Sequence, residues 1–240
     1  MKPDFTNGAI LLIDKPIGWT SFDVVNKLRY ALLKHVHLQQ KNEPGVKRKI
    51  KVGHAGTLDP LATGLLIVCV GKETKNVDTY MATEKEYTGT FYLGATTPSY
   101  DRETEVDTEY DCSAITAEGI ASAAAQFIGV QQQIPPVFSA IKQDGKRLYQ
   151  SARDGKHVEP NPRTIEILEF EITGIQMPLV HFRVVCSKGT YIRSLAHDFG
   201  KALGAGAYLY ELRRTRSGNF QVSDAIGVEQ CVARIQEAES

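Results

Sequence analysis

The chain has 240 residues, of which 42% are hydrophobic and 23% are charged, and its formal net charge is zero. This composition is typical of a globular protein, and the longest apolar run, Leu65 to Val70, is too short to span a bilayer. The four cysteines are scattered without a CxxC pair and Met1 to Gly8 lacks a signal-peptide pattern, so the sequence favours the cytoplasm and predicts no metal site.

Three stretches of the chain are basic although the net charge is zero. They span Arg29 to Lys51, Lys142 to Arg163 and Arg213 to Arg216, while acidic residues gather between Asp101 and Asp111. A neutral total can therefore hide a basic face that suits RNA phosphates. Ordinary solvated surface charge is the other interpretation, and charge alone leaves it open.

The first elements follow from short-range patterns. Ala9 to Ile13 is an apolar run that predicts a strand. Thr20 and Asp23 have capping-box spacing ahead of apolar residues at helical intervals, which predicts a helix to about Lys34. Residues 37–51 are polar and basic, and we expect a loop there.

The middle of the chain gives two strands and a helix. Leu65 to Val70 is predicted to be a buried strand that ends in a turn at Gly71. Strict alternation from Tyr87 to Leu93 predicts a second strand. Thr116 to Ile128 is rich in alanine and predicts a helix that Gly129 closes.

Residues 131–163 hold four prolines and predict a long, partly irregular insertion with a short helical stretch near Arg147 to Arg153. After it, patterns predict a helix from Thr190 to a stop at Gly204, and strands at Ile165 to Ile172, Val180 to Cys186, Ala207 to Leu212 and Phe220 to Val222. Strands and helices mix without a βαβ rhythm. We therefore expect an α+β fold with a mixed, mainly antiparallel sheet in a single domain.

The segment GHAGTLDPLATG at residues 53–64 carries the densest signal. Glycines permit positive φ or close backbone approach, and Pro60 fixes its own φ while restricting Asp59. Such a loop can hold one carboxylate in a defined pose beside a strand. It can equally be a tight structural turn in which Asp59 caps backbone amides.

Other chemistries have little support in the sequence. Gly71-Lys72 lacks the upstream glycine of a P-loop, and there is neither a GxGxxG after a strand nor a GxSxG elbow. His35 and His37 lack partner ligands, so they are interpreted as surface histidines.

At this point the chain resembles the bacterial tRNA pseudouridine-55 synthases, the TruB family. The loop GHAGTLDPLATGLL is similar to the signature loop of that family. The similarity continues in order from about residue 8 to 222, through GAILLIDKPIGWT (8–20), KEY (85–87), QIPPVFSAIK (133–142), KGTYIRSL (188–195) and LRRT (212–215). The family often has an aspartate in the segment after the LG strand end, where this chain has TTPSYD (96–101), and Phe138 stands where tyrosine is common. Only about twenty residues follow Val222, so we expect a short form without a complete C-terminal PUA domain.

The resemblance implies a reaction in which the uracil N1 bond to ribose breaks and the base rejoins through C5. The implied substrate is uridine 55 in the T-loop of tRNA. An isomerisation needs no redox cofactor or energy source, so none is expected. The resemblance further implies a pseudouridine synthase fold over residues 1–240, with an RNA-clamping insertion at about 131–163, acting as a cytoplasmic monomer on the T-arm.

The resemblance assigns catalysis to Asp59, Tyr87 and Arg193. Asp59 is the essential carboxylate, which could attack the sugar, attack the base or deprotonate the sugar. Arg193 is its expected counter-ion, because a guanidinium pairs a carboxylate at two points and stays charged. Tyr87 could stack on the flipped uracil and offer its hydroxyl as an acid or base.

The expected substrate-binding residues are His54, Tyr191, Leu212, Lys15 and Lys142. The target uridine must be extruded from a folded loop. By resemblance, His54 fills the gap that the base leaves. Tyr191 and Leu212 would line the pocket.

Structural interpretations stay open beside these roles. Arg193 could be a surface arginine, Tyr87 and His54 could be core residues, and Tyr191 and Leu212 could be packing. Two other functions are also open. One is an RNA-binding and refolding protein, for which the basic stretches would suffice, and the other is a pseudouridine synthase with a different RNA target.

Overall fold

The computed structural model describes residues 8–39, 50–139, 142–143, 146–147 and 160–237, with side chains omitted at 36–39, 142–143 and 146–147. These residues form two compact units. The terminal unit holds the chain up to Lys85 and again from Arg213, and the central unit runs from Glu86 to Leu212. The single catalytic domain expected from the sequence stays a prediction.

The terminal unit combines a small sheet with helices. Its elements are β1 (Ala9–Lys15), α1 (Ser21–Gln39), β2 (Val52–Ala55), β3 (Ala62–Val70), a 3-10 turn (Gly71–Asn76), α2 (Val77–Met81), the end of β12 (Ala207–Ser217), β13 (Phe220–Gln221), a 3-10 turn (Val222–Asp224), β14 (Ile226–Gly227) and α6 (Val228–Glu237).

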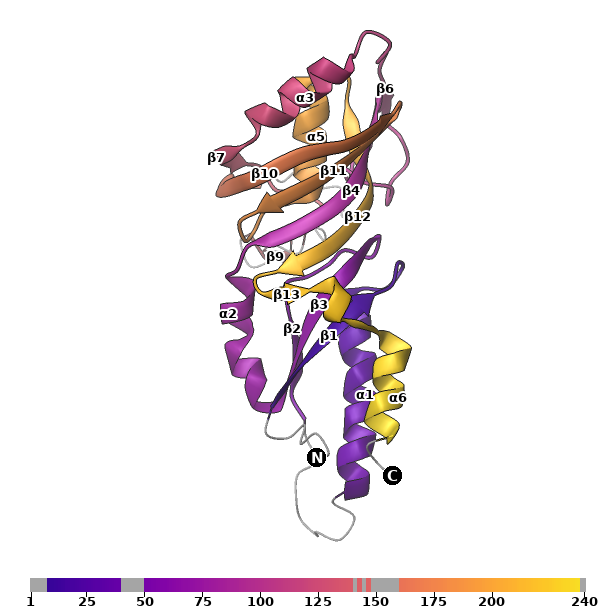
Figure 1. The fold of residues 1–240 in the computed structure, drawn as a ribbon, viewed down its shortest axis with the longest axis vertical. Helices are drawn as coiled ribbons and strands as arrows, with labels where there is room; N and C mark the ends of the chain where they lie inside the picture. Colours follow the sequence, from indigo (N-terminus) through magenta and orange to yellow (C-terminus); the bar gives the residue numbers. More distant parts are fainter. Residues whose placement is uncertain (1–7, 40–49, 140–141, 144–145, 148–159, 238–240) are drawn as a thin grey trace. The chain divides into compact units, whose positions relative to one another are not determined.

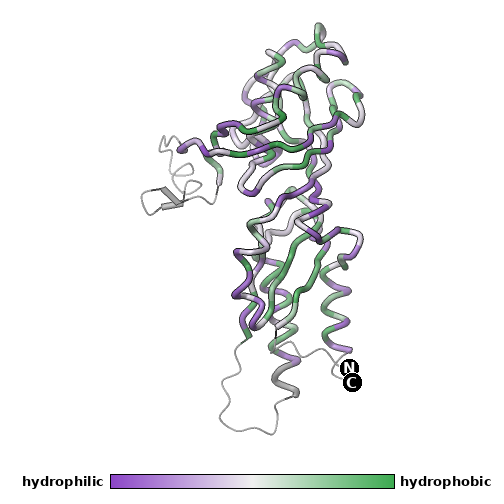
Figure 2. The backbone as a smooth tube through the Cα atoms, turned by 60° about the vertical axis from the view of Figure 1, so that its left-hand side comes forward, coloured by the Kyte–Doolittle hydropathy of each residue, from purple (hydrophilic) through white to green (hydrophobic). Residues whose placement is uncertain are grey.

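Strand β3 is the centre of this sheet. It pairs antiparallel with β1 along one edge, from Ala9 opposite Val70 to Lys15 opposite Gly64, and its last four residues pair with β2. β14 adds to β1 in parallel, and β13 pairs antiparallel with β12. The run Leu65 to Val70 is fully buried, as its unbroken apolar sequence requires. Figure 2 shows these strands in the hydrophobic colour over much of their length.

Helices α1 and α6 lie side by side in this unit (Figure 1). The predicted capping box is present at the start of α1, where the Thr20 hydroxyl accepts from the Asp23 amide and the Asp23 carboxylate accepts from the Thr20 amide. Such a cap stabilises the helix by about 1 kcal/mol. Lys27 of α1 and Glu229 of α6 form an exposed ion pair at 2.9 Å.

The central unit consists of an antiparallel sheet and two helices that pack against it. Its elements are β4 (Lys85–Leu93), β5 (Ala95–Thr96), β6 (Thr108–Glu109), α3 (Ala117–Gln126), β7 (Gly129–Gln133), β8 (Lys142–Gln143), β9 (Lys146–Arg147), β10 (Arg163–Gln176), β11 (Leu179–Cys186), α5 (Ile192–Ala202) and the start of β12. The strand order is β12-β4-β11-β10-β7.

An aromatic cluster forms the core of the central unit. Phe91 of β4 stacks on Phe182 of β11 at 4.1 Å between ring centroids and also contacts Phe199 of α5. Phe170 of β10 packs edge-on against Phe91 and Phe182. The rings therefore fix α5 against the sheet (Figure 1).

The structure confirms the α+β class with its mainly antiparallel sheet. It extends the first helix to Gln39, into the segment expected to be a loop. It also adds β2, β14 and α6, which the sequence patterns did not predict. The helical stretch expected near Arg147 to Arg153 is a strand at its first residue, and its remainder lies outside the described residues. No helix of the described chain is long and apolar enough to span a bilayer.

Candidate active site

Asp59 lies in the six-residue connection between β2 and β3 of the terminal unit, with its side chain half-buried. The segment that follows β1 holds this loop from one side. The Ser21 hydroxyl donates to the Leu58 carbonyl at 3.1 Å and accepts from the Leu58 amide at 2.8 Å. On the other side of Asp59, the Gly18 amide donates to the Pro60 carbonyl at 2.8 Å. The residues before and after the carboxylate are therefore both fixed.

Arg214 contacts both the start of the same loop and the strand that follows it. Its side chain is 1% exposed, and its guanidinium donates to the Gly56 carbonyl at 3.0 Å and to the Leu65 carbonyl at 2.7 Å. Gly64 makes this approach possible, because a Cβ there would lie 2.3 Å from the Arg214 carbonyl oxygen. Gly56 and Gly64 both have positive φ, +89° and +98°, which suits glycine. Arg214 was expected to contact RNA phosphate from a basic stretch, and its burial makes that expectation wrong.

Lys15 lies beneath the Asp59 loop and is fully buried. Its ammonium donates to the Trp19 carbonyl at 2.6 Å, with a longer contact of 3.5 Å to the Pro60 carbonyl. Burial lowers the pKa of Lys15 to about 8, while the Asp59 carboxylate opposes the shift and Arg214 adds to it. Lys15 thus acts as a support for the loop, and contact with substrate stays a prediction.

The lowered pKa of Lys15 predicts a pH dependence of stability. Its ordinary pKa is 10.5 and the folded value is about 8, so between these pH values the unfolded chain binds more protons and stability rises with pH. Relative to Lys15→Met, the wild type should gain up to about 3 kcal/mol of unfolding free energy across this window. Urea unfolding of both proteins at pH 7, 8, 9 and 10 measures the difference. A difference that does not change with pH would contradict the prediction.

His54 lies on β2, five residues before Asp59, and is half-buried. Burial lowers the pKa of His54, and the nearby Arg214 charge lowers it further. Its buried Nδ1 has no hydrogen-bond partner among the residues that the structure describes. A neutral imidazole of this kind is suited to stacking on a base, and the role expected for His54 stays a prediction.

Tyr87 belongs to the central unit and lies on β4 with 8% of its surface exposed. Because side chains alternate along a strand, Tyr87 shares a face with Gly89 and with the core residue Phe91. A Cβ at Gly89 would lie 2.7 Å from the Phe182 ring, so only glycine allows β4 and the Phe182 ring to pack this closely. Tyr87 therefore lies on the same face of β4 as the aromatic core, four residues before Phe91.

Arg193 lies in the first turn of α5 and is 4% exposed. Its Nε lies 3.7 Å from Oδ2 of Asp101, and its Nη1 donates to the Ser99 carbonyl at 3.3 Å. Asp101 in turn accepts from the Ser99 hydroxyl at 2.6 Å and from the Glu103 amide at 2.9 Å. The structure thus gives Arg193 a carboxylate partner in its own unit, and its pairing with Asp59 stays a prediction.

Asp101 is a candidate site residue that sequence reasoning missed. It was grouped with the acidic residues up to Asp111 as surface charge, whereas it is 4% exposed. The spacing of Ser99, Asp101 and Thr104 was the available signal, because serine, threonine and aspartate two to five residues apart often bond within one turn.

Two further predicted residues lie in the central unit. The Gln133 side chain holds Tyr191 at two points, accepting from its amide at 2.8 Å and donating to its carbonyl at 3.1 Å. The Arg163 guanidinium lies 5.4 Å from the centre of the Tyr191 ring. Leu212 is half-buried near the middle of β12. The side chain of Lys142 lies outside the described residues, as do residues 140–141, 144–145 and 148–159 of the expected clamp.

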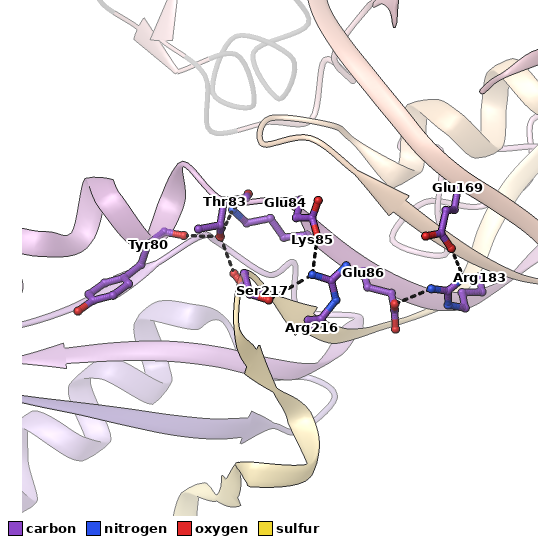
Figure 3. Close-up of polar contacts among 10 residues, drawn as sticks. Tyr80, Thr83, Glu84, Lys85, Glu86, Glu169, Arg183, Arg216 and Ser217 are labelled. Carbon is purple, nitrogen blue, oxygen red and sulfur yellow. Dashed lines mark hydrogen bonds and ion pairs between the residues drawn. The ribbon is translucent and has the colours of Figure 1, made fainter. Parts of the chain in front are cut away.

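Lys85 anchors the end of the terminal unit just before Tyr87. It is 6% exposed, and its ammonium donates to the Met81 carbonyl at 2.6 Å and to the Thr83 carbonyl. The neighbouring Glu84 accepts from Arg216 at 2.6 Å (Figure 3). These bonds fix the chain where it enters β4.

Arg183 links three strands of the central unit. It donates to Glu86 of β4 at 2.8 Å and to Glu169 of β10 at 2.6 Å, from its position on β11 (Figure 3). The two carboxylates raise the pKa of Arg183, so it stays charged. Among the described residues, no group of three or more His, Cys, Asp or Glu side chains could hold a metal ion.

Comparisons with known proteins cover nearly the whole chain. A model of the TruB family of pseudouridylate synthases, N-terminal domain, matches residues 42–192, and one of the tRNA pseudouridylate synthase B C-terminal domain matches residues 193–239. The tRNA pseudouridine synthase B of Flavobacterium johnsoniae is 53% identical over 95% of this chain and 96% of its own length. That of Phocaeicola vulgatus is 51% identical over 94% and 92%.

Two solved structures contain chains whose fold is similar to that of this chain. A chain of a Cbf5-Nop10-Gar1 complex is 31% identical with a TM-score of 0.69, covering 95% of this chain and 54% of that one. A chain of an H/ACA RNP bound to a substrate RNA containing 2'-deoxyuridine is 29% identical with a TM-score of 0.65, covering 93% and 52%. The chain therefore spans about half the length of these solved chains.

Proposed function

The chain belongs to the TruB family of pseudouridylate synthases and is a tRNA pseudouridine synthase, an isomerase, and from this premise we propose that it acts on uridine 55 in the T-loop of tRNA. The observation that carries the proposal is the Asp59 loop. Four separate contacts, from Ser21, Gly18, Lys15 and Arg214, hold the backbone on both sides of the carboxylate. A loop fixed in this way suits a reacting group that must meet its substrate in one pose.

We propose that Asp59 supplies the carboxylate that acts on the extruded uridine. The bond from ribose C1' to uracil N1 breaks, the base turns while it stays bound, and C1' bonds to C5. The proton on C5 is lost to solvent and N1 gains one, so atoms and electrons balance without a cofactor. Tyr87 and Arg193 complete the proposed catalytic set.

We propose that the target base leaves its loop before it reacts. A uridine inside a folded T-loop must be extruded, which costs a few kcal/mol. His54 is proposed to stack in the vacated space, which suits a neutral ring with a lowered pKa. Tyr191 and Leu212 are proposed to contact the extruded nucleotide. The enzyme is proposed to be monomeric and cytoplasmic, with the T-arm as its binding partner.

Tritium release from a T-arm stem-loop labelled at uracil C5 tests this function. The protein should release tritium from the labelled uridine at position 55, because exchange at C5 is obligatory in the isomerisation. A matched stem-loop with cytidine at position 55 and labelled uridines elsewhere should release none. Release from the second RNA at the same rate would mean that the enzyme modifies another position.

RNA binding should depend on salt although the net charge is zero, because affinity follows local phosphate contacts. Each contact contributes about −0.7 to −0.9 to the slope of log affinity against log salt. Replacing Lys47, Arg48 and Lys49 with alanine should therefore flatten the slope by about 2. In the third basic stretch Arg214 is buried and Arg213 is paired with Asp14 at 2.7 Å, so this stretch should add little.

Filter binding at several salt concentrations measures the slope. The triple variant should still modify the same uridine, because phosphate contacts position the RNA without reading its sequence. An unchanged slope would show that the 47–49 cluster does not touch RNA, and a new target position would show that it selects the uridine.

A further inference from the structure

Tyr100 has an unusual backbone conformation. Among the residues that the structure describes, it is the one non-glycine residue with positive φ, at 62°. A tyrosine in this region is strained, because its Cβ approaches the backbone. Its backbone is held by two bonds, from its amide to the Thr97 carbonyl at 3.1 Å and from the Leu209 amide to its carbonyl at 2.9 Å.

Tyr100 lies in sequence between two residues that contact Arg193. Ser99 before it supplies the carbonyl that accepts from the Arg193 guanidinium, and Asp101 after it supplies the carboxylate. The left-handed turn at Tyr100 sets the direction of both. Relaxation of Tyr100 to an ordinary backbone angle would therefore move both of these contacts with Arg193.

His197 stabilises Tyr100 from the helix that carries Arg193. The two rings are stacked at 4.1 Å between centroids with an interplanar angle of 16°. His197 follows Arg193 by four residues on α5, so the two side chains lie on one face of the helix, one turn apart. The helix thus contacts the 97–104 segment at two adjacent points.

A hydrogen bond through Nδ1 does not explain why a histidine occupies this place. Within the described parts of the chain, its buried Nδ1 has no hydrogen-bond partner. Burial lowers the pKa of His197, and Lys201 lowers it further, which outweighs the opposing effect of Asp107. The imidazole ring is therefore neutral near pH 7. Its stacking on the Tyr100 ring is the contact by which it can stabilise this turn.

We propose that Tyr100 and His197 are positioning residues for the isomerisation, because their stacked rings hold Asp101 and the Ser99 carbonyl in place against Arg193. This inference rests on the proposed role of Arg193. The stack does not touch substrate. Its effect is on the orientation of the guanidinium at the moment of reaction.

Single-turnover tritium release from the labelled T-arm tests the inference. His197→Ala should slow the rate about ten- to a hundredfold, the range expected when an active-site group is misplaced by up to about 1 Å. The dissociation constant for the RNA should change less than about twofold, which is under 0.5 kcal/mol. His197→Phe keeps a flat ring at the same place and should restore most of the rate.

Tyr100→Asn provides a second route to the same result. Asparagine tolerates positive φ but has no ring, so this variant should be slowed as much as His197→Ala. Since both changes break one contact, the double variant should be no slower than either single variant. Rate losses that multiply in the double variant would overturn the inference.

The matched control is His181→Ala, which removes a histidine of the same unit whose ring bonds to Thr90 at 3.0 Å. It should keep the full rate. A full rate in His197→Ala, or an equal loss in His181→Ala and His197→Ala, would overturn the inference. Arg193→Lys measured in parallel separates the two proposals. If Arg193→Lys and His197→Ala both keep the full rate, the proposed catalytic role of Arg193 is wrong, and the inference that rests on it is wrong with it.

Discussion

Replacing Asp59 with asparagine should abolish tritium release from the T-arm while leaving RNA affinity unchanged. Asparagine keeps the size of the side chain and removes its charge. The loop itself should survive, because its supports are bonds between other groups, such as Ser21 to the Leu58 backbone and Arg214 to the Gly56 carbonyl. We expect a rate loss of at least about 10³-fold, the scale seen when a group that acts in the transition state is removed.

The control for Asp59→Asn is Asp78→Asn, which changes an exposed carboxylate in the first turn of α2 in the same unit. It should retain the wild-type rate. Binding is measured by filter retention at fixed salt, so that a loss of RNA affinity is not taken for a loss of chemistry. Tritium release by Asp59→Asn near the wild-type rate would remove Asp59 from the mechanism. If the wild-type protein itself binds the T-arm but releases no tritium, the result would favour an RNA-binding and refolding protein.

The second large effect is expected from Arg193→Lys. A lysine keeps the charge but presents one point donor in place of a planar fork. Arg193 uses separate atoms for Asp101 and for the Ser99 carbonyl, and a single ammonium cannot reproduce that geometry. We expect a loss of about 10²-fold in the single-turnover rate, with the RNA affinity retained.

A matched arginine makes this test specific. Arg183 also lies in the central unit and also bridges two groups, the Glu86 and Glu169 carboxylates, but on exposed and half-buried strand surface. Arg183→Lys should leave the rate within about twofold of wild type, since such surface pairs contribute about 1 kcal/mol or less to stability. If Arg193→Lys reacts as fast as Arg183→Lys, then Arg193 does not orient a reacting group.

The elements with clear periodicity were predictable from the sequence. The run from Leu65 to Val70 and the alternation from Tyr87 to Leu93 became β3 and β4, because each pattern matches burial on a sheet. Strand β2 was missed, because Val52–Ala55 contains a glycine and a histidine and gains its pairing only from β3. Helix α6 was also missed, although it buries Val228, Cys231 and Ile235 at helical spacing.

Some residues of the candidate site were likewise predictable from the sequence and others were not. The Asp59 loop could be found from its local run of glycine, proline and aspartate. Arg214 could not, and Asp101 gave only the local spacing of Ser99, Asp101 and Thr104 as a signal, because the burial of both residues depends on partners far away in the chain. Arg214 bonds to Leu65, 149 residues before it, and Asp101 lies beside Arg193. A basic residue in a basic stretch gives no local sign that its charge points inward.

The dependence of the Asp59 loop on Arg214 bears on how the enzyme is made. Chains emerge from the ribosome N-terminus first, at about 5–20 residues per second. The carboxylate is thus synthesised early, yet the guanidinium that bonds to the first residue of its loop follows 158 residues after Gly56. The central unit is continuous in sequence and can fold while the chain is still growing, but the terminal unit must wait for β12. A nascent chain therefore carries every proposed catalytic side chain before Arg214, which supports the loop of the first of them, has been synthesised.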